Sequence, residues 1–185
     1  MKKIMFNDRL GLTQAVLEGR KTQTRRVISV NFYNRVDWKY FEEGHNDCII
    51  DDDISILDCG NYQVDEVVAI AQAYKDCKRF VCLQESAGWS NKMFVKAKLM
   101  PHHLKITNVR VERLQDISEE DCLKEGIIED LKGVQYSYPT NIGYCGQYPF
   151  DTPKQAFAAL IDKVGKKGTW ESNPWVFVYD FELVD

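Results

Sequence analysis

The chain has 185 residues, of which 44% are hydrophobic and 12% aromatic, a composition typical of globular proteins and not of disordered ones. Its formal net charge of -4 argues against non-specific coating of nucleic acid, because proteins that do this usually carry a marked basic excess. The amino terminus lacks the apolar core of a signal peptide, and no stretch reaches membrane-spanning length. We therefore expect one cytoplasmic domain over residues 1–185, with reduced cysteines and no membrane partner.

The first predicted element is a helix at about 8–18, with Asn7 or Asp8 as its N-cap, apolar residues at helical spacing and Gly19 as its stop. The next stretch, KTQTRRVISV at 21–30, is rich in Thr and Val. These residue types favour strands, so we expect a strand there after a tight turn.

Two further strands are predicted in the middle of the chain. The apolar run VVAIAQAY at 67–74 has the length of a strand, and LKITNVRVERL at 104–114 alternates apolar with polar residues. The alternation changes phase near Asn108, which predicts a β-bulge. A short helix follows at 117–126, where Ser118 is the candidate N-cap.

The last third of the chain contains a loop, a helix and a strand. Residues 127–150 are rich in Gly and Pro, which predicts a loop, whereas 152–165 form the clearest helical pattern, with Thr152 as N-cap. Residues 175–184 alternate like a half-buried strand. Strands scattered among short helices, without a βαβ rhythm, favour an α+β fold with a mixed or antiparallel barrel.

Three segments resemble the ASCH family: VLEGRKTQTRR at 16–26, ITNVRVERLQDISEEDCLKEGI at 106–127 and NPWVFVYDFELV at 173–184. The resemblance implies a small PUA-like mixed or antiparallel β-barrel with short flanking helices. Compared with minimal family members, this chain is similar to the longer bacterial and phage type, with insertions expected at about 28–62 and 128–150.

The GRKTQT motif carries the functional part of this resemblance. Some bacterial ASCH proteins are amidohydrolases that cleave N4-acetylcytidine to cytidine and acetate, and their lysine, threonine and glutamate match Lys21, Thr24 and Glu125 here. Other members are regarded as RNA-binding modules. The resemblance therefore implies a nucleoside amidohydrolase acting on N4-acylated cytidine, or alternatively an RNA-binding or modified-base-reading module without catalysis, or thirdly a phage-derived interaction protein.

Amide hydrolysis assigns chemical roles to these residues, with Thr24 as the candidate nucleophile and Lys21 as its base. The pKa of such a lysine must fall from about 10.4 to about 7–8. An ionised Glu125 raises that pKa, while nearby positive charges lower it. The positive charges around Lys21 in the sequence are Arg20, Arg25 and Arg26.

The spacing of the motif sets a condition on this chemistry. Residues 21 and 24 of a regular strand point to opposite faces, so convergence of Lys21 and Thr24 requires a turn or a bulge. The simpler interpretation is that GRKTQTRR is a solvated basic turn, or one that binds a phosphate through its arginines. Both interpretations stay open at this point.

A nucleobase site needs flat rings for stacking and polar groups that read the base edge. The candidates are Trp89 and Phe94 for stacking and Asn91 for the edge, although most aromatic residues in a chain of this size belong to the core. We expect these residues, the arginine segment 20–26 and the helix that carries Glu125 to surround one positively charged concavity.

No cofactor is implied by any motif. Cys77 and Cys82 precede the adjacent His102 and His103, but this spacing lacks the paired arrangement of a structural zinc site. We therefore expect no metal.

Overall fold

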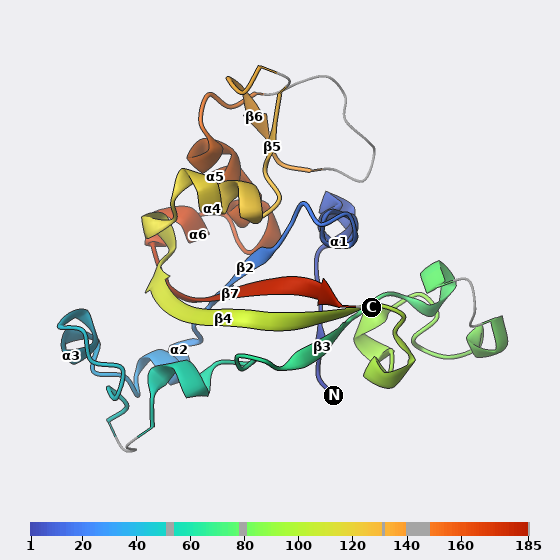
Figure 1. Ribbon diagram of the computed structural model, residues 1–185, viewed down its shortest axis with the longest axis horizontal. Helices are drawn as coiled ribbons and strands as arrows, with labels where there is room; N and C mark the ends of the chain where they lie inside the picture. Colours follow the sequence, from blue (N-terminus) through green and yellow to red (C-terminus); the bar gives the residue numbers. More distant parts are fainter. Residues whose placement is uncertain (51–53, 78–80, 131, 140–148, 185) are drawn as a thin grey trace.

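The computed structural model describes residues 1–50, 54–77, 81–130, 132–139 and 149–184. Within these ranges short helices surround a mixed β-sheet, which confirms the predicted α+β class (Figure 1).

The central sheet has five strands in the order β1-β3-β4-β7-β2, with bounds Lys3–Ile4, Val67–Ile70, His103–Arg113, Trp175–Val184 and Gln23–Val27. β1 and β3 are parallel, and every other pair is antiparallel. The structure differs from the expected barrel, because the described strands form an open sheet whose edge strands are β1 and β2. Between these two edges, the Arg26 side chain donates to the Met5 carbonyl oxygen at 2.7 Å, so a side chain stands where a closed barrel would need a backbone ladder.

The strand register divides the central sheet into two faces. In antiparallel pairs, opposed residues point to the same side, and successive residues alternate. One side, which we call the helix-covered face, presents Gln23, Arg25, Arg110, Glu112, Val176, Val178 and Asp180. The other side, which we call the aromatic face, presents Thr24, Arg26, Val109, Phe177 and Tyr179.

The predicted bulge in β4 is confirmed. The register with β7 shifts between Ile106 and Asn108, so that Thr107 is the extra residue. Because a bulge takes up one residue without moving the following side chains to the wrong face, Arg110 and Glu112 stay on the helix-covered face.

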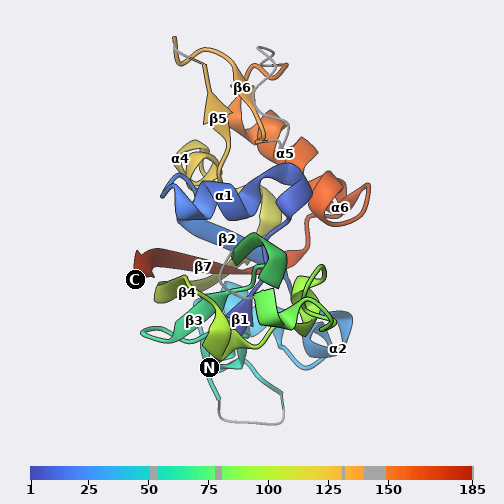
Figure 2. The same ribbon diagram turned by 90° about the vertical axis from the view of Figure 1, so that its right-hand side faces the viewer.

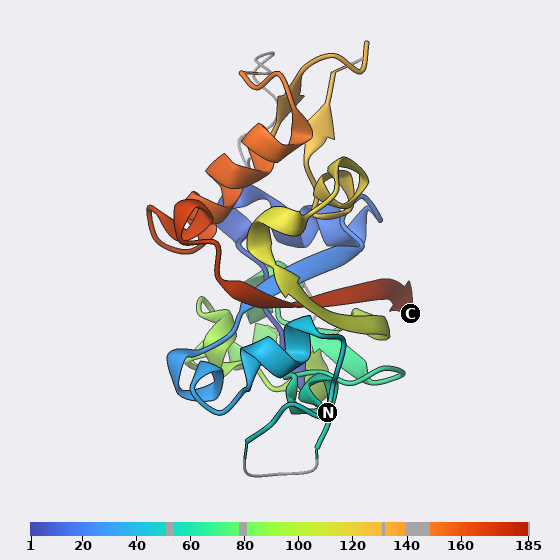
Figure 3. The same cartoon turned by 90° about the vertical axis from the view of Figure 1, so that its left-hand side faces the viewer.

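Six α-helices are described: α1 Leu12–Leu17, α2 Val30–Tyr33, α3 Trp38–Glu42, α4 Glu119–Lys124, α5 Pro153–Val164 and α6 Thr169–Ser172. α4, α5 and α6 lie on one side of the sheet, and α2 and α3 on the other (Figures 2 and 3). Two predicted N-caps are confirmed, since the Ser118 side chain accepts from Asp121 N at 3.0 Å and the Thr152 side chain from Gln155 N at 3.2 Å. The helix predicted at 8–18 is divided instead: Asn7 caps the 3₁₀ turn Asp8–Leu10, and α1 begins after Gly11.

Single 3₁₀ turns make up much of the remaining chain. They span Asp8–Leu10, Ile56–Cys59, Tyr74–Cys77, Val81–Leu83, Lys92–Phe94, Ala97–Leu99 and Leu114–Asp116.

The described parts of the two predicted insertions contain regular secondary structure. Residues 28–62 contain α2, α3 and a 3₁₀ turn, and they bury Ile28, Val36, Ile49 and Ile56 in the main core. Helices of one turn are too short to show a hydrophobic period, so the sequence predicted no helix in this insertion. In 127–150, β5 Ile128–Glu129 pairs with β6 Tyr136–Ser137, while 140–148 lie outside the described residues.

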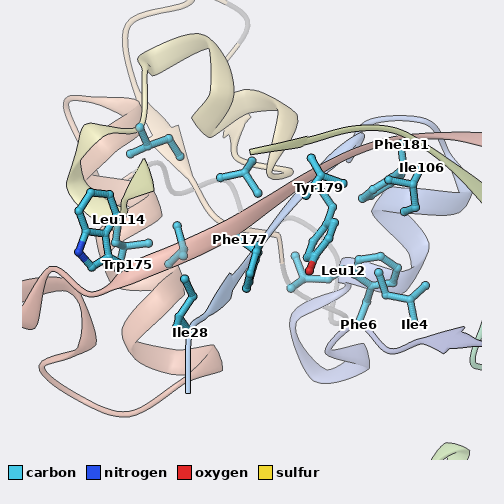
Figure 4. Close-up of a cluster of buried hydrophobic side chains, with 14 of the residues drawn as sticks. Ile4, Phe6, Leu12, Ile28, Ile106, Leu114, Trp175, Phe177, Tyr179 and Phe181 are labelled. Carbon is cyan, nitrogen blue, oxygen red and sulfur yellow. The ribbon is translucent and has the colours of Figure 1, made fainter. Parts of the chain in front are cut away.

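The core extends to both sides of β7, so the prediction of a half-buried strand is wrong for its first half. Val176 and Val178 on the helix-covered face are as fully buried as Tyr179 on the aromatic face. Figure 4 shows the Tyr179 side chain of β7 pointing toward Leu12 and Phe6. A smaller second cluster contains Ala69, Ala71, Tyr74, Val95 and Met100.

Candidate functional site

The predicted pair of Lys21 and Glu125 is formed inside the protein. Lys21 Nζ lies 2.5 Å from Glu125 Oε2, and the two side chains are 2% and 5% exposed. Backbone contacts hold both residues in place: Lys21 N donates to Ala15 O at 3.0 Å, and Thr22 N donates to Lys124 O at 2.9 Å. The turn after α1 and the end of α4 are thus joined at the start of β2.

The Lys21 ammonium has a complete set of acceptors. Besides Glu125 Oε2, its Nζ donates to the carbonyl oxygens of Gln23 at 2.7 Å and Glu125 at 2.9 Å. An ammonium has three hydrogens, so none remains for another acceptor. Accordingly, no hydrogen bond joins Lys21 to Thr24 in the described part of the chain.

Burial is the main cause of a lowered pKa at Lys21, because it penalises the charged ammonium. The Glu125 carboxylate opposes this change, while the positive charges of Arg26 and Arg25 add to it. The sequence predicted the competition between arginines and glutamate. It did not identify burial as the largest contribution.

Thr24 lies in a regular part of β2, without the turn or bulge that its convergence with Lys21 was expected to need. It pairs with Tyr179 on the aromatic face and is 5% exposed. Its neighbours Gln23 and Arg25 point to the helix-covered face. The motif therefore divides its side chains between the two sides of the sheet.

Phe6 connects the two sides of this region. Lys21 Nζ and Arg26 Cζ each lie 5.9 Å from the centre of the Phe6 ring, and the Phe181 ring lies 5.8 Å from it. We call these four residues the Phe6 cluster. Since Arg26 shares its face with Thr24, Phe6 marks where the Lys21 ammonium meets the aromatic face. A single phenylalanine near the amino terminus gave no sequence signal for this role.

Arg25 belongs to a buried ionic network and not to an open binding surface. Its side chain is 1% exposed and lies 2.7 Å from Glu112, 3.1 Å from Glu125 and 3.2 Å from Asp121. Burial alone lowers the pKa of Arg25, but Glu125 and Glu112 reverse this and raise it. Arg25 therefore stays charged and ties β2 to β4 and α4.

The other arginines of the motif are also engaged. Arg20 is on the surface, where its side chain is 43% exposed and lies 2.5 Å from the Glu18 carboxylate. Arg26 is half-buried against Phe6 and the Met5 carbonyl. Carboxylates thus balance Arg20, Lys21 and Arg25, so this stretch is much less positive than its sequence indicates.

Trp89 and Asn91 have structural roles in the fold. Trp89 packs against the second cluster, which includes Tyr74. The Asn91 side chain accepts from Met93 N at 3.0 Å and caps the turn that follows it. Neither residue lines the concavity described below.

Phe94 is 61% exposed, and its segment is fixed next to Phe6. The Lys92 ammonium donates to the Phe6 carbonyl oxygen and lies 2.8 Å from Asp8. The segment that carries Phe94 therefore packs beside the Phe6 cluster, whereas Trp89 is held in a different cluster. Lys92 is a further contact of this region that sequence patterns did not reveal.

A concavity of about 550 Å³ opens on the helix-covered face, lined by Thr22, Gln23, Thr107, Arg110, Asp121, Lys124, Asp180 and Phe181. None of the predicted site residues lines it. Its two cations are balanced, since Arg110 lies 2.5 Å from Asp121 and 2.8 Å from Asp180, and Lys124 lies 2.7 Å from Glu120. This concavity is polar but not strongly positive.

In the described ranges, no group of three or more His, Cys, Asp or Glu side chains is arranged to hold a metal ion. The helices described there are all too short or too polar to cross a bilayer. Comparison with known proteins adds no relative: no family model, no curated protein and no solved structure matches this chain.

Proposed function

We propose that the chain is a nucleoside amidohydrolase that cleaves N4-acylated cytidine, with N4-acetylcytidine yielding cytidine and acetate. The observation that carries the proposal is the environment of Lys21, whose ammonium is buried, has a lowered pKa and pairs with Glu125. A lysine with a lowered pKa can act as a general base near neutral pH. Shifted pKa values of this kind are concentrated at active sites.

In the proposed reaction, Thr24 attacks and Lys21 accepts its proton. The neutral amine has two N–H groups and one lone pair, so it gives up one of its three hydrogen bonds to receive that proton. The Thr24 oxygen then bonds to the acyl carbon, and the carbonyl oxygen becomes an oxyanion. As the oxyanion collapses, the bond from the acyl carbon to N4 breaks, and Lys21 returns the proton to N4.

The second half of the reaction restores the enzyme. Water attacks the ester on Thr24, Lys21 accepts a proton from that water, and the bond between the acyl carbon and the Thr24 oxygen breaks. The proton passes to Thr24, and the acyl group leaves as a carboxylic acid. One water is consumed for each amide cleaved.

Arg26 of the Phe6 cluster and the neighbouring Glu125 suit supporting roles. Arg26 shares the aromatic face with Thr24, so we assign its guanidinium to the oxyanion. Glu125 holds the lysine in place through its carboxylate and its carbonyl group. It acts through Lys21 and is a positioning residue.

The choice of a nucleoside over RNA rests on charge. RNA binding draws on cations that are free to replace counterions at phosphates. Here Arg20, Lys21 and Arg25 contact carboxylates, which favours a small uncharged ligand. Membership of the ASCH family, with a PUA-like barrel modified by an open edge, is part of this proposal and rests on the motif resemblance.

The test is release of cytidine and acetate from N4-acetylcytidine by the purified chain, followed by chromatography. We expect turnover by the wild-type protein and by Thr24→Ser, which keeps the hydroxyl. Thr24→Val keeps the shape but removes the nucleophile, so turnover should be lost while the melting temperature stays near that of the wild type. Lys21→Arg should also be inactive, because a guanidinium does not release its proton near neutral pH.

Full activity of Thr24→Val and Lys21→Arg would show that these residues do not perform the chemistry. If the wild-type protein binds cytidine derivatives but releases no acetate, the binding-module alternative replaces the hydrolase. Its RNA affinity should then be measured at several salt concentrations, since phosphate contacts weaken as salt rises.

A further inference from the structure

The concavity on the helix-covered face takes no part in the proposed chemistry. Gln23, which lines it, points to the opposite side of the sheet from Thr24. Its volume of about 550 Å³ lies within the range of roughly 300–1,000 Å³ that is usual for small-molecule sites. Its lining residues come from the start of β2, the bulge of β4, α4 and β7. It therefore has room for one small ligand.

The charges around the concavity favour an uncharged ligand. Arg110 and Lys124 are its cations, and Asp121 and Asp180 are its anions. Arg110 lies between the two carboxylates, 2.5 Å from Asp121 and 2.8 Å from Asp180. An anion here would meet both carboxylates, and a cation would meet the guanidinium, so neither would find a free counter-charge. A polar ligand without net charge fits this lining best.

Arg110 keeps two hydrogen-bond donors for such a ligand. Its guanidinium has five N–H groups. Three of them donate, from Nε to Glu112, from Nη1 to Asp180 and from Nη2 to Asp121. Each terminal nitrogen has two hydrogens, so one N–H remains on Nη1 and one on Nη2. The side chain is 32% exposed, so a ligand in the concavity can reach these two adjacent donors.

Acceptors lie on both sides of these donors. The Asp180 carboxylate has about four acceptor positions. Three of them are filled, by Gln23, Asn108 and Arg110. The Asp180 and Asp121 side chains are 25% and 16% exposed, so both are open to solvent. The row of carboxylate, guanidinium and carboxylate thus presents acceptors and donors in alternation.

Two threonine hydroxyls add to this row. Thr22 and Thr107 line the concavity, and in the part of the chain that the structure describes neither hydroxyl forms a hydrogen bond with another residue. Thr107 is the extra residue of the bulge in β4. Bulges are over-represented next to active sites, where they redirect a side chain. Both hydroxyls can donate to a ligand or accept from it.

We propose that the concavity binds an uncharged ligand with a vicinal diol, such as a sugar ring, through Arg110 and Asp180. A hydroxyl donates and accepts at the same atom, so one hydroxyl can donate to Asp180 and accept from Nη1 of Arg110. The neighbouring hydroxyl accepts from Nη2 and donates toward Asp121. An amide has its donor and its acceptor on different atoms, so it matches this alternation less well. The site does not depend on the proposed hydrolase activity.

The test titrates methyl β-D-ribofuranoside into the purified, ¹⁵N-labelled chain and follows the backbone amide signals by NMR. We expect saturable shifts at Thr22, Thr107 and Asp180, and none with the 2,3-dideoxy analogue, which lacks the diol. Adenosine and methyl α-D-glucopyranoside distinguish two sources of the diol. Tighter binding of adenosine assigns the ribose of a nucleoside, and tighter binding of the glucoside assigns a free sugar.

Two variants locate the binding groups. Asp180→Asn keeps the shape of the side chain but removes its charge, so the Kd for the riboside should rise about 10–100-fold. Thr107→Val removes one hydroxyl at an exposed position and should raise the Kd about 2–10-fold. This second variant decides the question if Asp180→Asn strongly lowers the melting temperature.

Asp37→Asn is the matched control. It makes the same change from carboxylate to amide at the N-cap of α3, on the other side of the sheet, where asparagine caps equally well. Its Kd should equal that of the wild type. Equal affinity for the riboside and its dideoxy analogue, or an unchanged Kd in both site variants, would overturn the proposal. So would the absence of saturable shifts at the three amides, or displacement of the riboside by inorganic phosphate.

Discussion

The two faces of β2 satisfy their polar groups very differently. On the helix-covered face, Arg25 is surrounded by three carboxylates and by the Gln23 amide, and its burial is matched by partners. On the aromatic face, Thr24 lies opposite Tyr179, and Trp175 Nε1 on the same side of the sheet is buried without a hydrogen-bond partner. Alternate residues of the five-residue strand β2 thus lie in two different environments, one ionic and one aromatic.

This contrast suggests different roles for the two faces: the helix-covered face stabilises the fold, and the aromatic face carries the proposed chemistry. A saturated ionic network fixes the relative positions of a strand and a helix, but it leaves no group free for a ligand. The aromatic face has few polar groups, and those it has are not all satisfied. Proteins tolerate such local costs mainly at functional sites. We therefore expect substitutions on the two faces to have separable effects on folding and on turnover.

The largest expected effect on stability is that of Arg25→Met. The substitution removes the buried cation that contacts Glu112, Asp121 and Glu125, and leaves Glu125 with Lys21 and Glu112 with Arg110. Breaking a buried ion pair in this way costs about 3–5 kcal/mol. Urea unfolding should therefore show a much lower free energy of unfolding than for the wild type. A loss below about 1 kcal/mol would mean that the network contributes little to holding α4 on the sheet.

A smaller, pH-dependent effect is expected at Lys21. Its pKa is 10.5 in the unfolded chain and lower in the fold, because burial disfavours the ammonium. Between these two values the unfolded chain binds more protons, so the free energy of unfolding rises with pH. The stabilising contribution is complete above pH 10.5 and is lost as the pH falls through the folded-state pKa.

Lys21→Met removes this titration and nothing else that ionises. The free energy of unfolding of the wild type minus that of the variant should therefore increase as the pH is raised from about 7 toward 10.5. Chemical denaturation at several pH values measures it. A difference that decreases with pH would show that Glu125 outweighs burial and raises the lysine pKa.

The smallest effect is expected for Arg20→Ala, which tests whether every arginine of the motif matters. The Arg20 and Glu18 side chains are 43% and 44% exposed, and surface pairs contribute little. Stability should change by less than about 0.5 kcal/mol, and kcat/KM should be unchanged. A clear loss of turnover would place Arg20 in the substrate site and blur the distinction between the two faces.

The sequence predicted those features that leave a local pattern. β4 and β7 follow from alternation, the bulge from its change of phase at Asn108, and two helix starts from their capping residues Ser118 and Thr152. The meeting of Lys21 with Glu125 was expected only through the family motif, since the two residues are 104 positions apart.

What the sequence did not predict depends on long-range packing. Whether Arg25 faces solvent or three carboxylates is decided by which strand and helix lie beside it. The same holds for Phe6, whose ring centre lies 5.9 Å from Lys21 Nζ. Trp89 has the aromatic ring expected of a residue that stacks on a nucleobase. In the fold, however, it packs against the second cluster.

Because of the bulge at Thr107, deletion of this residue should disturb β4 less than deletion of another residue of the strand. Removing a residue elsewhere in a strand rotates every following side chain to the opposite side of the sheet. Removing Thr107 instead restores regular alternation from Ile106 to Asn108, so Arg110 and Glu112 keep their places. A chain shortened by this one residue should still fold with a straighter strand, which makes Thr107 the natural point for length variation in β4.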